Sequence, residues 1–72
     1  IETSSALEFF SSADVVFIFN QSISALELFV DGQHFKLEQH QSIYIHSNQN
    51  VKHLVFPASA ERQCCWIELS KI

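Results

Sequence analysis

The chain has 72 residues, of which 47% are hydrophobic and 17% charged, and its net charge at pH 7 is -4. This length allows one domain with a single small core, and the seven Phe and one Trp make the chain too aromatic for a disordered segment. The only cations are Lys36, Lys52, Arg62 and Lys71, which form no basic patch, so we do not expect this segment to bind nucleic acid directly.

The sequence carries no targeting signal that we recognise. No apolar run approaches the roughly 18 residues of a membrane span, and no charged stretch precedes an apolar core as in a signal peptide. We therefore expect a soluble, cytoplasmic chain without a membrane partner. Because the first residue is Ile1 and the end does not resemble a polar tail, residues 1–72 are interpreted as a single domain from a longer protein.

The neighbouring Cys64 and Cys65 should point to opposite faces of a strand, which predicts reduced thiols rather than a disulfide.

The first predicted element lies in the stretch "ALEFF", residues 6–10. Ser5 followed by Glu8 resembles a helix-capping box, but the same stretch also suits a strand before the turn "SSAD". We prefer the strand. The next run, "DVVFIFN", is almost continuously β-branched and aromatic, which predicts a well-buried strand that ends in a turn over residues 20–22.

The clearest pattern is "ALELFVDGQHFKLE", in which Asp31-Gly32 separates two alternating runs and predicts a two-residue hairpin turn. Pairing Val30 with Gln33 then sets the whole register. On the apolar face, this register places Leu28 opposite Phe35 and Leu26 opposite Leu37. On the other face, it places Glu27 opposite Lys36 and Phe29 opposite His34.

Three more strands are predicted in the second half of the chain. In "SIYIH", residues 42–46, Ile43 and Ile45 share one face while Tyr44 and His46 share the other. Turn-forming residues 47–50 lead into "VKHLVF", residues 51–56, which stops at Pro57. A loop over residues 59–63 precedes the last strand, "CCWIEL". The fold class is therefore all-β, a small antiparallel barrel or sandwich of six or seven short strands.

The four histidines raise the question of a metal site, which needs three or four converging side chains. His34 and His46 are predicted on the faces opposite the apolar ones, and His40 lies in a polar connection. The direction of His53 is left open. We therefore predict surface or cross-strand histidines, with no metal and no cofactor. One Gly in the whole chain excludes a phosphate-binding glycine loop, and no serine lies in a nucleophile motif, so we do not expect an enzyme.

Three aromatic residues have more than one interpretation. Trp66 is expected to pack in the core, with a pocket wall or an interface anchor as the alternatives. Phe29 and Tyr44 lie on the polar face of their strands, where either cross-strand packing or a partner surface accounts for them.

The run "LFVDGQHFKLEQHQSIYIHSNQNVKHLVF", followed by "CCWIELS", resembles the cupin-like N-terminal domain of AraC-family transcription regulators. The resemblance covers about Leu26 to Leu69 and includes Val30-Asp31-Gly32, Leu37, Ile43, Ile45, Asn48, His53 and Trp66-Ile67. The chain departs from the cupin pattern in three ways. His40-Gln41 replace a frequent Gly-Asp, His46 replaces a frequent Pro, and the metal-binding "HxH" with its downstream Glu is missing.

The resemblance implies a cupin-type, non-catalytic regulatory domain of a transcription activator. Such a domain binds a small ligand, a regulatory protein or a second copy of itself, and DNA is contacted only by a helix-turn-helix part that these residues do not include. We expect a ligand pocket inside the domain near Phe17, Phe19, Leu28, Phe35 and Trp66. The interface candidates are Phe29, Tyr44, His34 and His46, and an exposed edge strand is a further route for association.

Two alternative functions remain open. One is a small metal-dependent cupin enzyme that uses His34, His46 and His53. The other is a structural β-module of a larger enzyme, since "ELFVDGQ-F-L" followed by a polar turn and a strand also resembles the carboxy-terminal β-portion of NAD kinases.

Overall fold

The computed structural model describes residues 4–46, 51–59 and 65–71. Within these ranges the chain forms strands and no helix, and accordingly none of the described residues belongs to a helix able to cross a membrane. The strands are β1 (Leu7–Ser11), β2 (Val15–Asn20), β3 (Leu26–Val30), β4 (Gln33–Leu37), β5 (Ser42–His46), β6 (Lys52–Phe56) and β7 (Cys65–Ser70).

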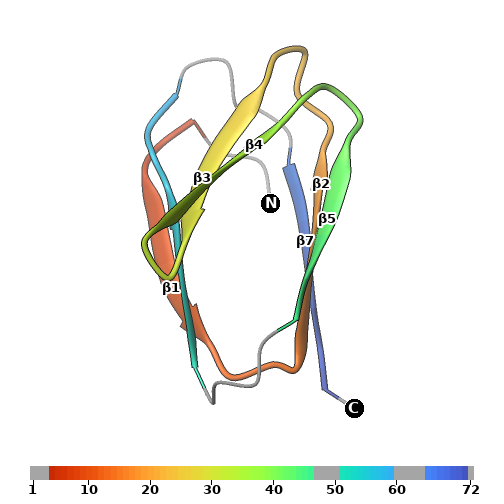
Figure 1. Cartoon of the computed structure of the whole chain (residues 1–72). Coiled ribbons are helices and arrows are strands. Elements are labelled where there is room, and N and C mark those ends of the chain that lie inside the picture. Colours follow the sequence, from red (N-terminus) through yellow and green to blue (C-terminus); the bar gives the residue numbers. More distant parts are fainter. Residues whose placement is uncertain (1–3, 47–50, 60–64, 72) are drawn as a thin grey trace.

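The strands form two antiparallel sheets. Sheet A has the strand order β1-β6-β3-β4, and sheet B has the order β5-β2-β7. The sheets face each other, with the β1–β2 connection at one end and the β2–β3 and β4–β5 connections at the opposite end (Figure 1). Because the described strands pair only within their own sheet, the molecule is an open sandwich rather than a closed barrel. The predicted all-β antiparallel fold is confirmed, whereas the cupin type stays a prediction.

The β3–β4 hairpin has the predicted register at every position. Val30 pairs with Gln33 and Phe29 with His34, and the pairing continues to the far end of the hairpin. The backbone φ is 50° at Asp31 and 82° at Gly32. Two successive positive φ values are typical of the type I′ turn, which matches the right-handed twist of the flanking strands. The Asp-Gly pair therefore sets both the turn and the pairing.

The ambiguous first element is a strand, as preferred from the sequence. β1 pairs with β6 over five positions, from Leu7 opposite Phe56 to Ser11 opposite Lys52. Phe9 and Phe10 suit a pleated, half-buried surface better than a helix. The backbone partner that β6 offers along the whole length of β1 decides the conformation, because a short isolated helix would lack comparable tertiary contacts.

The hydrophobic core lies between the sheets and is built from alternate residues of each strand. In β2, Val16 and Ile18 are fully buried, while the intervening Phe17 and Phe19 are only half-buried. The buried cluster consists of Val16, Ile18, Leu26, Leu28, Val30, Leu37, Ile45, Leu54, Phe56 and Cys65. The predicted turn at residues 47–50 lies outside the described residues, as do Cys64 and residues 60–63 of the loop predicted over residues 59–63.

Candidate functional site

The structure divides the five residues expected around an interior pocket between two places. Leu28 is fully buried and Phe35 is half-buried, and both face the interior from sheet A. Phe17, Phe19 and Trp66 instead lie on the outer face of sheet B, because their neighbours along β2 and β7 face the core. The expectation that all five line one interior pocket is therefore wrong for these three residues. The run "VVFIFN" is apolar on both sides, so its pattern could not show which side was buried.

The outer face of sheet B gathers aromatic side chains from all three strands. We call Phe17, Phe19, Tyr44 and Trp66 the aromatic face. Phe17 and Phe19 come from the central strand, Tyr44 comes from β5 and Trp66 from β7. Tyr44 is 63% exposed and Trp66 is 45% exposed, so both rings contact solvent over much of their surface. The expectation that Trp66 packs in the core is therefore wrong.

Phe17 is the centre of the aromatic face. Tyr44 is directly opposite Phe17 in the β2–β5 pairing, with the ring centroids 4.8 Å apart and the planes inclined by 45°. Trp66 meets Phe17 at 5.6 Å and 86°, an edge-to-face contact. These tilted and edge-to-face geometries are the ones that aromatic quadrupoles favour. The ring planes are therefore inclined to one another and do not form a flat stack.

A hollow of about 520 Å³ lies on the aromatic face. It is lined by Val15, Phe17, Tyr44, Trp66, Glu68 and Ser70. Glu68 is directly opposite Phe17 in the β2–β7 pairing, so its side chain lies on the same face of the sheet as the central ring. The hollow thus combines three aromatic rings, one negative charge and the hydroxyls of Tyr44 and Ser70, which is the mixture of apolar walls and a few polar groups typical of ligand sites.

Of the three remaining interface candidates, Phe29 and His34 lie on the outer face of sheet A. Their rings contact each other across β3 and β4 with centroids 5.1 Å apart, and His34 Nε2 lies 3.7 Å from Glu27 Oε1. The cross-strand packing interpretation therefore accounts for Phe29, which is half-buried. His46, by contrast, is exposed at the end of β5, opposite Val15.

The Phe, His and Glu arrangement occurs a second time on the same face. His53 lies opposite Phe10, whose ring stacks on it with centroids 4.6 Å apart, and Glu8 Oε1 lies 3.3 Å from His53 Nε2. That nitrogen is buried and makes no hydrogen bond, so the two atoms are close without forming a hydrogen bond. In each case a Glu-x-Phe sequence on one strand flanks a histidine on its antiparallel neighbour. The direction of His53, left open by the sequence, is outward.

The histidine positions argue against the metal-dependent enzyme. His34 and His53 lie on the outer face of sheet A, while His46 lies on the outer face of sheet B, so the proposed ligands do not converge. His40 stacks on Phe19 with ring centroids 6.3 Å apart. Among the residues that the structure describes, no group of three or more His, Cys, Asp or Glu side chains is placed to hold a metal ion.

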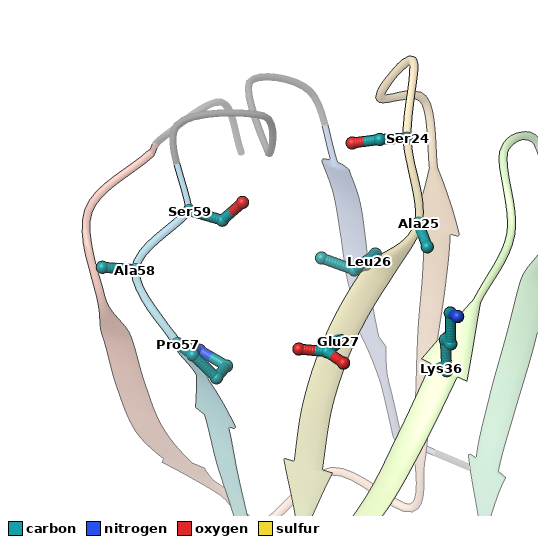
Figure 2. Close-up of a pocket in the computed structure, with 8 residues that line it drawn as sticks. All are labelled: Ser24, Ala25, Leu26, Glu27, Lys36, Pro57, Ala58 and Ser59. Atoms are coloured by element: carbon teal, nitrogen blue, oxygen red, sulfur yellow. The ribbon is translucent and has the colours of Figure 1, made fainter.

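A second hollow, of about 450 Å³, opens in sheet A between β3 and the chain that follows β6 (Figure 2). The described β3–β6 pairing is short, comprising Phe29 with Val55 and Val30 with Leu54. The strands therefore separate toward Leu26 and Pro57. Ser24, Ala25, Leu26 and Glu27 line one side of the hollow, Pro57, Ala58 and Ser59 the other, and Lys36 reaches it from β4. Its lining is small side chains and charges of both signs.

The sequence analysis did not predict the burial of four polar residues among those described, of which Asn20 and Lys52 are buried completely. Asn20 is fully buried at the end of β2, where its Nδ2 donates toward the backbone oxygens of Ser24, Leu37 and Glu38 and its Oδ1 accepts from Ser22 N. Lys52 is also fully buried, and its Nζ donates to the Ala13 carbonyl. Both residues occupy positions that face the core in the alternating pattern of their strands. This alternation was the sequence signal that could have predicted their burial.

The fold and the site together define a small open β-sandwich that carries an exposed aromatic hollow on its three-stranded sheet. No protein family, no curated protein and no solved structure matches the chain. The assignment of function therefore depends on the chemistry of the surface.

Proposed function

We propose that this chain is a non-catalytic regulatory domain that works by binding a partner through the aromatic face. The resemblance to AraC-type regulators supplies the setting, in which the domain controls a transcription activator and a separate part of the protein contacts DNA. The binding partner is a small ligand, a regulatory protein or a second copy of the chain.

One observation carries the proposal. Three neighbouring strands turn Phe17, Tyr44 and Trp66 to the same side, and the last two of these remain extensively exposed. Clusters of exposed aromatic residues favour contact with a partner, since Tyr and Trp contribute large apolar area at low conformational-entropy cost. Single exposed apolar residues are ordinary on protein surfaces, but a contiguous group of large rings is not.

Self-association is the form of binding that can be tested without knowing a ligand. We expect the solution mass, measured by light scattering over a concentration series, to rise above the 8.3 kDa of one chain. The substitution Tyr44→Ser should remove this rise, because it deletes an exposed ring from the aromatic face without touching the core.

Phe10→Ser is the matched control. Phe10 is 66% exposed, close to the 63% of Tyr44, but it lies on the outer face of the opposite sheet. Association that both substitutions weaken equally would contradict a specific role for the aromatic face. A mass that stays at one chain throughout the series would reject self-association as its function.

A further inference from the structure

The hollow on the aromatic face has ring geometry that suits a rounded ligand. Tyr44 is inclined by 45° to Phe17, and Trp66 stands nearly perpendicular to it. Three rings inclined to one another present their π faces and edges from different directions. A planar group stacks best on one flat ring face, whereas a compact group with apolar substituents on all sides contacts several inclined rings at once.

The charge of the hollow is complementary to a cation. Glu68 supplies a carboxylate directly opposite Phe17, and none of the six lining residues is basic. The nearest cation along β7, Lys71, lines a different hollow with Phe10 and Ser11. The chain as a whole has a net charge of -4, which adds a weak attraction for positive ligands.

We propose that this hollow binds a small organic cation with a methylated ammonium head group. The aromatic faces attract the positive charge, the methyl groups contact the ring surfaces that line the hollow, and the Glu68 carboxylate balances the charge. The volume of about 520 Å³ exceeds that of the head group alone, which leaves room beside Val15 and Ser70 for the rest of the ligand. This inference rests on the proposed function, because it assigns a ligand class to the same aromatic face.

Tetramethylammonium chloride is a suitable probe, and the protein supplies its own reporter. Trp66 is the only tryptophan of the chain and lines the hollow, so its fluorescence should change in a saturable way during titration. Sodium chloride at equal ionic strength controls for salt. Neutral tert-butyl alcohol, of similar size, controls for apolar contact without charge. The titration should be run at a protein concentration where light scattering gives the mass of a single chain.

Two substitutions test the two parts of the proposed site. Tyr44→Leu keeps an apolar side chain but removes a π face, and Glu68→Gln keeps the shape but removes the charge. Each should weaken tetramethylammonium binding by roughly three- to tenfold, the range expected for one cation–π or partly exposed ionic contact. Phe10→Leu, which makes an equivalent change on sheet A, should leave the affinity unchanged.

The inference would be overturned if tert-butyl alcohol bound as tightly as tetramethylammonium. It would also be overturned if the Tyr44→Leu and Glu68→Gln variants bound tetramethylammonium as tightly as the unaltered chain. A titration in which the Trp66 fluorescence shows no saturable change at any tetramethylammonium concentration would overturn the inference as well. Light scattering separates this failure from that of the proposed function, because self-association that depends on Tyr44 would persist even where the cation does not bind. Loss of both results would reject both cation binding and self-association at the aromatic face.

Discussion

Asn20 ties three segments of the chain to the end of β2. Its side-chain amide has two hydrogens and three backbone oxygens within 3.1 Å, from Ser24, Leu37 and Glu38, so one hydrogen is shared. Its backbone also takes part, since Asn20 N donates to Gln41 O and His40 N donates to Asn20 O. This single residue therefore fixes the two connections that pass between the sheets at the same end of the sandwich.

Replacing Asn20 should be among the more damaging single substitutions. We expect Asn20→Ala to lower the free energy of unfolding by about 3 kcal/mol, because buried backbone groups lose their partners. Asn20→Asp should be worse, since a carboxylate cannot donate to the three oxygens that surround it. Urea unfolding followed by circular dichroism measures both, with Gln21→Ala at the adjacent exposed position as the control. Equal stability of the Ala and Asp variants would contradict the donor role.

Lys52 presents the opposite case, a buried amine with a thin supporting network. Its only hydrogen bond among the described residues goes to the Ala13 carbonyl, and the residue opposite it in β1 is Ser11. Burial of a charged group with so few partners costs more than one hydrogen bond returns. Lys52→Met, which keeps the length of the side chain, should therefore raise the free energy of unfolding by about 1–3 kcal/mol.

A second variant makes this expectation testable in both directions. Lys52→Ala removes the same amine but leaves a cavity, and it should lower the free energy of unfolding by about 2–4 kcal/mol. The expected order of stability in urea unfolding is thus Met, then Lys, then Ala. A Met variant less stable than the unaltered chain would instead show that the bond to Ala13 is needed to close that end of the sandwich.

The β3–β4 hairpin depends on two residues with positive φ, and each can be tested separately. A side chain at Gly32 would meet no atom within 4 Å, so Gly32→Ala changes only the backbone preference at φ 82° and should cost about 1 kcal/mol. Asp31 also connects the hairpin to β6, because its Oδ1 accepts from His53 N and its own N–H donates to His53 O.

The substitutions at Asp31 should consequently differ. Asp31→Asn keeps both an acceptor oxygen and a tolerance of positive φ, so its stability should lie within about 0.5 kcal/mol of the unaltered chain. Asp31→Ala loses both and should cost about 1–2 kcal/mol. Thermal unfolding of the two variants beside Gly32→Ala measures the difference. If the Asn and Ala variants were equally unstable, the negative charge of Asp31 would have to be the important property.

The hairpin was predictable because local chemistry determines it, with the turn type and the alternation agreeing on one register. The outer position of Phe17 and Phe19 could not be predicted from the sequence. β2 is apolar on both sides, so the strands that pair with it decide which side faces the core. The outward orientation of Trp66 was unpredictable for the same reason, since it depends on the pairing of β7 with β2. The aromatic face brings together residues from three strands that are distant in sequence, and a local sequence pattern cannot predict such a long-range contact. The outward direction of His34 and His46 followed from local alternation and is confirmed.

The two outer faces of the sandwich have different chemistry, which matters in so small a molecule. On sheet A, Phe10 and Phe29 each contact a histidine that has a glutamate beside it, so these rings already have local partners. On sheet B, Tyr44 and Trp66 contact Phe17 and leave much of their surface to solvent. Phe10 is as exposed as Tyr44, so the difference between the faces is that sheet B gathers three rings around one hollow, which favours sheet B as the binding side.

The small core of a 72-residue chain leaves a narrow margin of stability, on the order of 4–11 kcal/mol at typical values per residue. Phe56 is fully buried between the sheets, opposite Leu7 in the β1–β6 pairing, whereas Phe10 on the other side of sheet A is 66% exposed. Phe56→Ala should cost about 3–5 kcal/mol, a loss comparable with the lower end of that margin, and the urea midpoint of the variant should fall sharply. Phe10→Ala makes the same chemical change and should cost less than about 1 kcal/mol, because only its stacking on His53 is lost. Far-ultraviolet circular dichroism in a urea series measures both variants, and similar losses for the two would mean that the inner and outer faces of sheet A are not distinguished by burial.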